Sequence, residues 1–170
     1  MTPGEPRVGI LMGSASDHAV MAEAGKVLDE LGVAYEMTVA SAHRTPDRVD
    51  AFVKAAETKG IRVLVAGAGG AAHLAGVLAS KTTMPVIAVP LASSPLAGFD
   101  ALLSSVQMPP GIPVATVSVG PWGARNAAIL AAQILATADA GLRERLAAYR
   151  KKLAAGVEKA AAEVEAKRTV

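Results

Sequence analysis

The chain has 170 residues, with 17 Lys or Arg against 15 Asp or Glu and a formal net charge of +2. This small charge and an aromatic content of 3% argue against a nucleic-acid binder, which relies on a strongly basic surface or on aromatic stacking platforms. With no cysteine, the chain has no disulfide, thiolate metal site or cysteine nucleophile. Its length and its 52% hydrophobic content predict one folded domain, residues 1–170.

The start of the chain and its apolar runs predict a cytoplasmic protein that does not enter a membrane. Residues 1–7 lack the charged region and long apolar segment of a signal peptide. No apolar stretch approaches the ~18 residues that a membrane helix needs. A domain of this size buries only about 70% of its unfolded surface, so the apolar excess also predicts a buried interface between subunits.

Short β-branched runs alternate with Ala-rich segments of helical period. In chain order, the predicted elements are a strand at Val8–Met12, a helix at 17–31, a strand at 35–40, a helix at 46–59, a strand at 62–66, a helix at 74–80, a strand at 86–89, a helix at 100–106, a strand at 114–119, and helices at 125–137 and 141–167.

Several element boundaries carry recognisable signals. Gly32 and Gly60 are expected to end the first two helices. Thr45 is expected to supply an N-cap oxygen, with Pro46 at the first helical position. Pro90 is expected to follow the fourth strand.

Five strands joined by helices predict an α/β fold, a doubly wound parallel sheet between two helical layers. The expected core spans residues 7–138, and a C-terminal helical arm spans residues 139–170. The arm has no following strand to cover. Two interpretations stay open for it, a solvated tail or an arm laid on a neighbouring subunit.

In a doubly wound sheet, ligands bind outside the carboxyl ends of the strands. After the first strand, Gly13 permits a tight turn, and the hydroxyls of Ser14 and Ser16 lie beside the N–H groups of a helix start. This outlines a phosphate cradle. The alternative is an ordinary serine N-cap, with Asp17 favourably placed for the helix dipole.

The second strand is followed by His43 and Arg44, just ahead of a predicted helix. Imidazole has a reference pKa of ~6.5, so it can donate and accept a proton near neutrality. The guanidinium can bind a phosphate or carboxylate through two N–H groups. A plain surface loop is less favoured, because the small neighbouring residues would let a ligand approach the backbone.

The third strand is followed by a small-residue loop, residues 67–72, and then by His73. The loop offers unobstructed backbone N–H groups, and His73 adds a second imidazole. The alternative is a flexible glycine turn with His73 at a helix start.

Other motifs fail. Gly67, Gly69 and Ala72 match a dinucleotide-binding pattern, but that motif needs an acidic residue ~20 positions later, and none occurs between Glu57 and Asp100. The triplet at 80–82 lacks the glycines of a P-loop. The three histidines have no metal-binding spacing. The sequence therefore predicts no nicotinamide cofactor, no P-loop ATP site and no metal.

Together, the three loops resemble the family of N5-carboxyaminoimidazole ribonucleotide mutase, the catalytic-subunit type of phosphoribosylaminoimidazole carboxylase in purine biosynthesis. Residues 105–109, 111–114 and 126–128 extend the resemblance, which spans roughly residues 7–138 in order. It implies a flavodoxin-like fold and a homooctamer whose C-terminal segments contact neighbouring subunits. It also implies a small ribonucleotide substrate and no cofactor.

The family's reaction moves a carboxylate from the exocyclic nitrogen of an aminoimidazole ribonucleotide to ring carbon C4. The resemblance implies that His43 protonates that nitrogen, releasing CO2, and later accepts the C4 proton. His73 would line the CO2 end or orient the substrate. The substrate-binding set would comprise Ser14, Ser16 and Arg44 at the phosphate, Asp17 at the ribose, and Ser41, Gly69, Gly70 and Ala71. Residues 107–110 would form part of a cover.

Two rival functions stay open at this point. The related carboxylase branch uses free CO2 with the decarboxylated ribonucleotide, and a nucleotide-binding or scaffolding module would carry out no chemistry. Four residues depart from the family pattern: Ala97, Phe99, Trp122 and Arg125. They are expected to affect the cover and the subunit contacts rather than the reaction class.

Overall fold

The computed structural model describes residues 5–167. Two short segments lie outside this range: residues 1–4, which belong to the start examined for a signal peptide, and residues 168–170, which end the predicted arm. The strands are β1 (Val8–Met12), β2 (Tyr35–Val39), β3 (Val63–Gly69), β4 (Val86–Leu91) and β5 (Ala115–Thr116). The α-helices are α1 (His18–Glu30), α2 (Pro46–Thr58), α3 (His73–Ala79), α4 (Phe99–Val106), α5 (Pro121–Ala136) and α6 (Ala140–Ala166), and a 3-10 turn, η1 (Ala15–Asp17), precedes α1.

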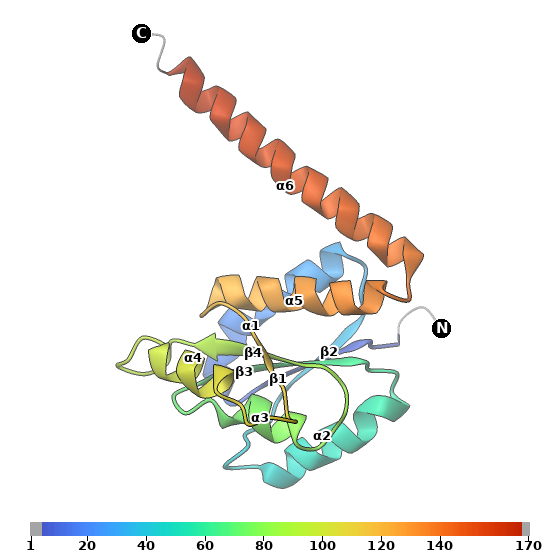
Figure 1. Cartoon of the computed structure of the whole chain (residues 1–170), viewed down its shortest axis with the longest axis vertical. Helices are drawn as coiled ribbons and strands as arrows, with labels where there is room; N and C mark the ends of the chain where they lie inside the picture. Colours follow the sequence, from blue (N-terminus) through green and yellow to red (C-terminus); the bar gives the residue numbers. More distant parts are fainter. Residues whose placement is uncertain (1–4, 168–170) are drawn as a thin grey trace.

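The strands form one parallel sheet in the order β2-β1-β3-β4-β5. This is the flavodoxin-like order of a doubly wound sheet, as predicted. The helices lie on both faces (Figure 1). Successive residues of β1 show why: Ile10 packs in the core beneath α1 and α5, whereas Leu11 packs in the core beneath α2 and α3.

Small side chains let α1 and α5 approach each other closely. Ala24 of α1 and Ala124, Ala127 and Ala131 of α5 have no exposed surface. Helices packed through alanine reach short interaxial distances, because the separation depends on the side chains at the contact. The near absence of aromatic residues therefore reflects thin, tightly packed layers.

The predicted loop 67–72 is wrong in its first half, because β3 continues to Gly69. Gly67 pairs with Val89 and Gly69 pairs with Leu91 in the parallel ladder with β4. Glycine has low intrinsic strand propensity, but here the ladder from the neighbouring strands overrides that preference.

Pro90 lies within β4 instead of ending it. The carbonyls of Ala88 and Pro90 accept from the N–H groups of Val117 and Gly120, at 3.1 and 2.9 Å. The missing N–H of Pro90 therefore faces the side of β5, which has already ended at Thr116, so no ladder bond is lost. β5 is far shorter than the predicted strand at 114–119.

Helix ends agree in part with expectation. Gly32 and Gly60, at φ +63° and +86°, end α1 and α2 as predicted. α5 begins at Pro121, four residues before the predicted 125, because a proline in the first helical turn needs no N–H partner.

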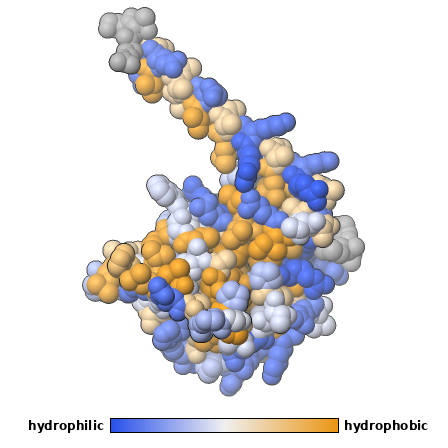
Figure 2. All heavy atoms as spheres, in the orientation of Figure 1, coloured by the Kyte–Doolittle hydropathy of each residue, from blue (hydrophilic) through white to orange (hydrophobic). Residues whose placement is uncertain are grey.

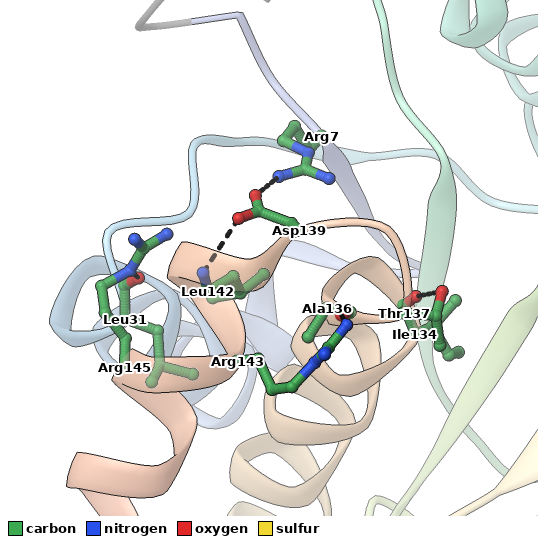
Figure 3. Close-up of polar contacts among 9 residues, drawn as sticks. All are labelled: Arg7, Leu31, Ile134, Ala136, Thr137, Asp139, Leu142, Arg143 and Arg145. Atoms are coloured by element: carbon green, nitrogen blue, oxygen red, sulfur yellow. Dashed lines mark hydrogen bonds and ion pairs between the residues drawn. The ribbon is translucent and has the colours of Figure 1, made fainter.

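The first turns of α6 are fixed to the body by polar contacts (Figure 3). Asp139 caps the helix by accepting from the N–H of Leu142 at 2.9 Å, and it pairs with Arg7 at 2.7 Å. Arg145 donates to the carbonyl of Leu31 at 2.7 Å, and Arg143 donates to the carbonyl of Ala136 at 3.2 Å. Both arginines thus satisfy carbonyls at the ends of other helices.

Beyond these contacts, α6 projects away from the sheet as a continuous helix (Figure 1). Its residues 151–166 are exposed, and hydrophobic residues line one side of the projection (Figure 2). Leu153, Val157 and Val164 are 54, 68 and 67% exposed. Within residues 5–167, no helix combines the length and apolarity needed to cross a bilayer.

Candidate functional site

A cavity of about 350 Å³ opens where β1, β2, β3 and β4 end. This volume lies within the usual range for small-ligand sites. Eight predicted site residues line it: Ser14, Ser16, Asp17, Ser41, His43, Arg44, Gly69 and His73. The cavity therefore brings together loops from three neighbouring strands, as the rule for doubly wound sheets predicts.

The loop after β1 forms a capping box. The Ser14 hydroxyl accepts from the Ser16 N–H at 3.3 Å, and the Asp17 carboxylate accepts from the Ser14 N–H at 3.1 Å. The Ser16 hydroxyl donates to that of Ser14 at 2.8 Å. The N-cap interpretation is thus correct for the local structure, and the same hydroxyls also face the cavity.

Asp17 is buried, with 9% of its surface exposed. Burial raises the pKa of its carboxyl above the ordinary 3.8, while the Ser14 N–H and the nearby Arg44 charge oppose this shift. The folded protein therefore carries a carboxylate that is poorly solvated at neutral pH.

We expect the Asp17→Asn variant to unfold less readily than the parent at neutral pH. A raised pKa means that the protonated carboxyl favours the fold. Its contribution is complete below pH 3.8 and is lost as the pH rises through the higher pKa of the folded state. Asparagine resembles the protonated form, so the difference in free energy of unfolding should be small in acid and grow toward neutrality. Urea unfolding at a series of pH values measures it, and a variant less stable than the parent at pH 7 would contradict it.

The loop after β2 is closed by Thr45, but not as predicted. The Thr45 hydroxyl does not cap α2. It accepts from the Ser41 N–H at 2.9 Å and donates to the Ser41 carbonyl at 3.2 Å, because the loop folds Ser41 back onto it. Pro46 begins α2, as expected.

Arg44 is held across the gap between the first two loops. Its Nη2 donates to the Gly13 carbonyl at 2.8 Å, and its backbone N–H donates to the Ser41 hydroxyl at 3.2 Å. These contacts place a fixed positive charge beside the hydroxyls of Ser14 and Ser16. Such a guanidinium suits a phosphate or carboxylate ligand.

His43 and His73 meet in the cavity from different loops. Nε2 of His43 lies 2.8 Å from Nδ1 of His73, and the rings meet edge to face with centroids 4.9 Å apart. One nitrogen must donate and the other accept, so this contact couples the tautomers of the two rings. Both side chains are exposed to the cavity and to solvent.

Only one of the three predicted binding residues in the loop after β3 lines the cavity. Gly69 lines the cavity, whereas Gly70 and Ala71 are not among its lining residues. Gly70 has φ +60° and Ala72 φ +47°, and these left-handed residues turn the chain away from the cavity floor and into α3.

Six lining residues were not among the predicted site residues: Gly13, Ala42, Ala68, Ala72, Leu74 and Ser93. The first five lie in or next to the three loops from which the site was predicted, and Ser93 lies outside them. Ser93 is the notable omission, because it is the contribution of the loop after β4. Its position beyond the fourth strand was the available signal. That signal was obscured because the predicted strand ended at 89, whereas β4 continues to Leu91.

The four departures from the family pattern lie outside the cavity lining. Arg125 pairs with Glu23 of α1 at 2.5 Å, and Lys26 together with Arg125 lowers the pKa of the Glu23 carboxyl. Phe99 and Trp122 are 65 and 77% exposed, and Ala97 has φ +52°.

Among residues 5–167, no group of three or more His, Cys, Asp or Glu side chains is arranged to hold a metal ion.

The fold and the cavity define a doubly wound α/β protein with a small, basic, hydroxyl-lined site at the carboxyl edge of its sheet. Residues 7–156 match the family described as AIR carboxylase, and the chain belongs to that family. The match extends past the predicted boundary at 138 into α6.

Named relatives and a solved structure agree with this assignment. The N5-carboxyaminoimidazole ribonucleotide mutase of Pyrococcus abyssi is 57% identical over 148 residues, which is 87% of this chain and 84% of that protein. The mutase of the same name from Escherichia coli K12 is 54% identical over 145 residues, 85% of this chain and 86% of that protein. A crystal structure of Treponema denticola PurE superposes with a TM-score of 0.84 at 30% identity, covering 93% of this chain and 98% of that one.

Proposed function

We propose that this chain is an N5-carboxyaminoimidazole ribonucleotide mutase of purine biosynthesis, an isomerase that moves the carboxylate to C4 without a cofactor. The observation that carries the proposal is the 2.8 Å contact between His43 and His73 in the same cavity as Arg44. It occurs in a chain more than half identical to proteins named as this mutase.

The charges and hydroxyls of the cavity support one substrate orientation. Ser14, Ser16 and Arg44 lie together and suit the dianionic phosphate. Asp17 is an acceptor for the ribose hydroxyls beside them. The aminoimidazole then extends toward His43, and Ser41 and Gly69 complete the walls on either side.

The chemistry needs one group that donates a proton and later accepts one. His43 donates a proton to the exocyclic nitrogen as the N–C bond breaks and CO2 leaves with its two oxygens. Ring carbon C4 then attacks the CO2 carbon, and His43 takes the proton released from C4. The protons balance over the cycle, so neither ATP nor an external base is consumed. His73 hydrogen-bonds to His43 and sets its tautomer.

Retention of CO2 requires a closed pocket between the two half-reactions. The loop from β3 to α3 brings a backbone with small side chains to the carboxylate end of the substrate. Residues 107–110, which directly follow α4, form part of the cover. In this proposal, Gly70 and Ala71 lie where the loop meets the cover of the pocket, and not on the cavity floor.

The carboxylase reaction with free CO2 is the second candidate, since the family description itself is AIR carboxylase. One experiment separates the two. Purified protein is incubated with the N5-carboxylated ribonucleotide, without ATP or bicarbonate, and the C4-carboxylated product is followed. A rate no higher than the spontaneous background would refute the mutase proposal, and a preference for free CO2 with the decarboxylated ribonucleotide would favour the carboxylase.

We also propose a homooctamer in the cytoplasm, in which α6 lies on a neighbouring subunit. The exposed apolar side of α6 supports this, and so does a second apolar surface at α4 (Figure 2). On that surface Phe99 and Leu103 are 65 and 47% exposed. We expect light scattering to give a mass near eight chains of 17.1 kDa, and a mass near a single chain would contradict the assembly.

A further inference from the structure

The turn between β3 and α3 is a thin wall between two cavities. The proposed substrate cavity lies on one side, and a second cavity of about 270 Å³ lies on the other, between α3 and α4. Ala72 and His73 line both cavities. The turn therefore has free space behind it, and its position depends on what holds it.

Few hydrogen bonds hold the turn, although the side chain of Ala72 is buried. Within it, the Ala72 N–H donates to the Gly69 carbonyl at 3.1 Å. From outside, the hydroxyl of Ser104 on α4 donates to the carbonyl of Ala71. Among the side chains of residues 5–167, that of Ser104 alone is hydrogen-bonded to the backbone of residues 69–72.

This contact restrains a backbone that would otherwise relax. Ala72 has φ +47°, a left-handed conformation that is unfavourable for a residue with a Cβ and persists only when its surroundings impose it. Ala72 directly precedes His73, so rotation at Ala72 would move the imidazole away from His43. The Ser104 hydroxyl fixes the peptide immediately before this residue.

Ser104 also lies three positions before Gln107, where α4 has ended and the segment 107–110 begins. One helix therefore holds the turn and carries the segment that we propose as cover. A movement of α4 would therefore displace the turn and the segment 107–110 at the same time.

We infer that Ser104 is a positioning residue. Its hydroxyl holds the Ala71–Ala72 peptide. This keeps His73, and the small-residue loop that would surround the released CO2, in a fixed position relative to His43. The inference rests on the proposed function only for the reaction that it serves. The effect of the hydrogen bond from Ser104 to Ala71 on the turn can be measured without substrate.

We expect Ser104→Ala to lower kcat about tenfold and to change KM less than about twofold, because the turn lies at the carboxylate end of the substrate and not at the phosphate end. A looser pocket should also lose CO2. The fraction of turnovers that end in the decarboxylated ribonucleotide should therefore rise, an effect that a general loss of folded protein would not produce.

Ser105→Ala is the matched control. The Ser105 hydroxyl is on the same helix and donates to the Ala101 carbonyl at 2.8 Å within that helix, so it does not reach the turn. Ser104→Thr keeps a hydroxyl and should restore kcat to within about threefold of the parent. Wild-type kcat and product ratio in Ser104→Ala, or an equal fall in Ser105→Ala, would overturn the inference.

Amide hydrogen exchange provides the test without substrate. We expect faster exchange at Ala72 and His73 in Ser104→Ala, with no change in the free energy of unfolding of the whole protein. Unchanged exchange would overturn the inference, whereas an inactive parent would refute the proposed function and leave this test intact. If Ser104→Ala does not fold, Ser104→Cys has a similar size and a weaker donor, and wild-type kcat in that variant would equally overturn the inference.

Discussion

The His43→Asn variant should lose about 10³-fold in kcat while remaining folded, since general acid–base groups typically contribute 10² to 10⁴. The asparagine amide occupies the place of the imidazole Nδ1 and does not reach that of Nε2, the atom that lies 2.8 Å from Nδ1 of His73, so the contact between the two loops is lost as well. Asparagine cannot exchange a proton near neutrality. His43→Gln, whose longer side chain brings an amide to the place of Nε2, can keep the hydrogen bond to His73 and should lose as much kcat, which separates proton transfer from the structural role of the side chain.

His18→Asn is the control for this experiment. His18 is exposed at the start of α1 and is not among the residues lining the cavity. Steady-state rates with the N5-carboxylated ribonucleotide should be unchanged in this variant. If His43→Asn retained most of the parent rate, or if both variants lost activity equally, His43 would not be the proton carrier.

The sequence was sufficient to predict that Ser14, His43 and His73 converge. Each lies in or at the end of the loop that follows a strand, and β2, β1 and β3 are neighbours in the sheet, so three loops distant along the chain must meet at one edge. The contact between His43 and His73 was not predictable, because it depends on the turn at Ala72 and not on any periodic pattern.

The misplaced boundaries share a physical cause. Gly67, Gly69 and Pro90 have low strand propensity, yet all three lie within strands because the sheet imposes their conformation. Whether a proline is tolerated depends on which side its missing N–H faces, and this is fixed only after the neighbouring strand has been placed. Because the predicted fourth strand ended at residue 89, whereas β4 continues to Leu91, Ser93 was not recognised as a residue of the loop at a strand end.

Gly69→Ala should lower kcat/KM about 100-fold, because small displacements of groups around a reacting centre have effects of this size. A Cβ at this position would overlap the Ser93 hydroxyl, and would lie 3.0 Å from the Ser93 Cβ and 3.1 Å from the carbonyl oxygen of Leu91. The serine can rotate, but the Leu91 carbonyl belongs to β4 and cannot easily move. The strain should therefore displace the turn that leads to His73, and should also lower the free energy of unfolding by about 1–3 kcal/mol.

A second substitution identifies where the strain arises. In the Gly69→Ala, Ser93→Gly double variant, both Ser93 atoms that crowd the new methyl group are gone, so most of kcat/KM should return. Recovery should be incomplete, since the Leu91 carbonyl remains 3.1 Å away. Gly156→Ala, on the exposed part of α6 with no atom within 4 Å of the new Cβ, should leave kcat/KM unchanged. Parent-like kcat/KM in Gly69→Ala would show that the turn adjusts without consequence, whereas a loss that Ser93→Gly does not relieve would place the strain at the Leu91 carbonyl of β4.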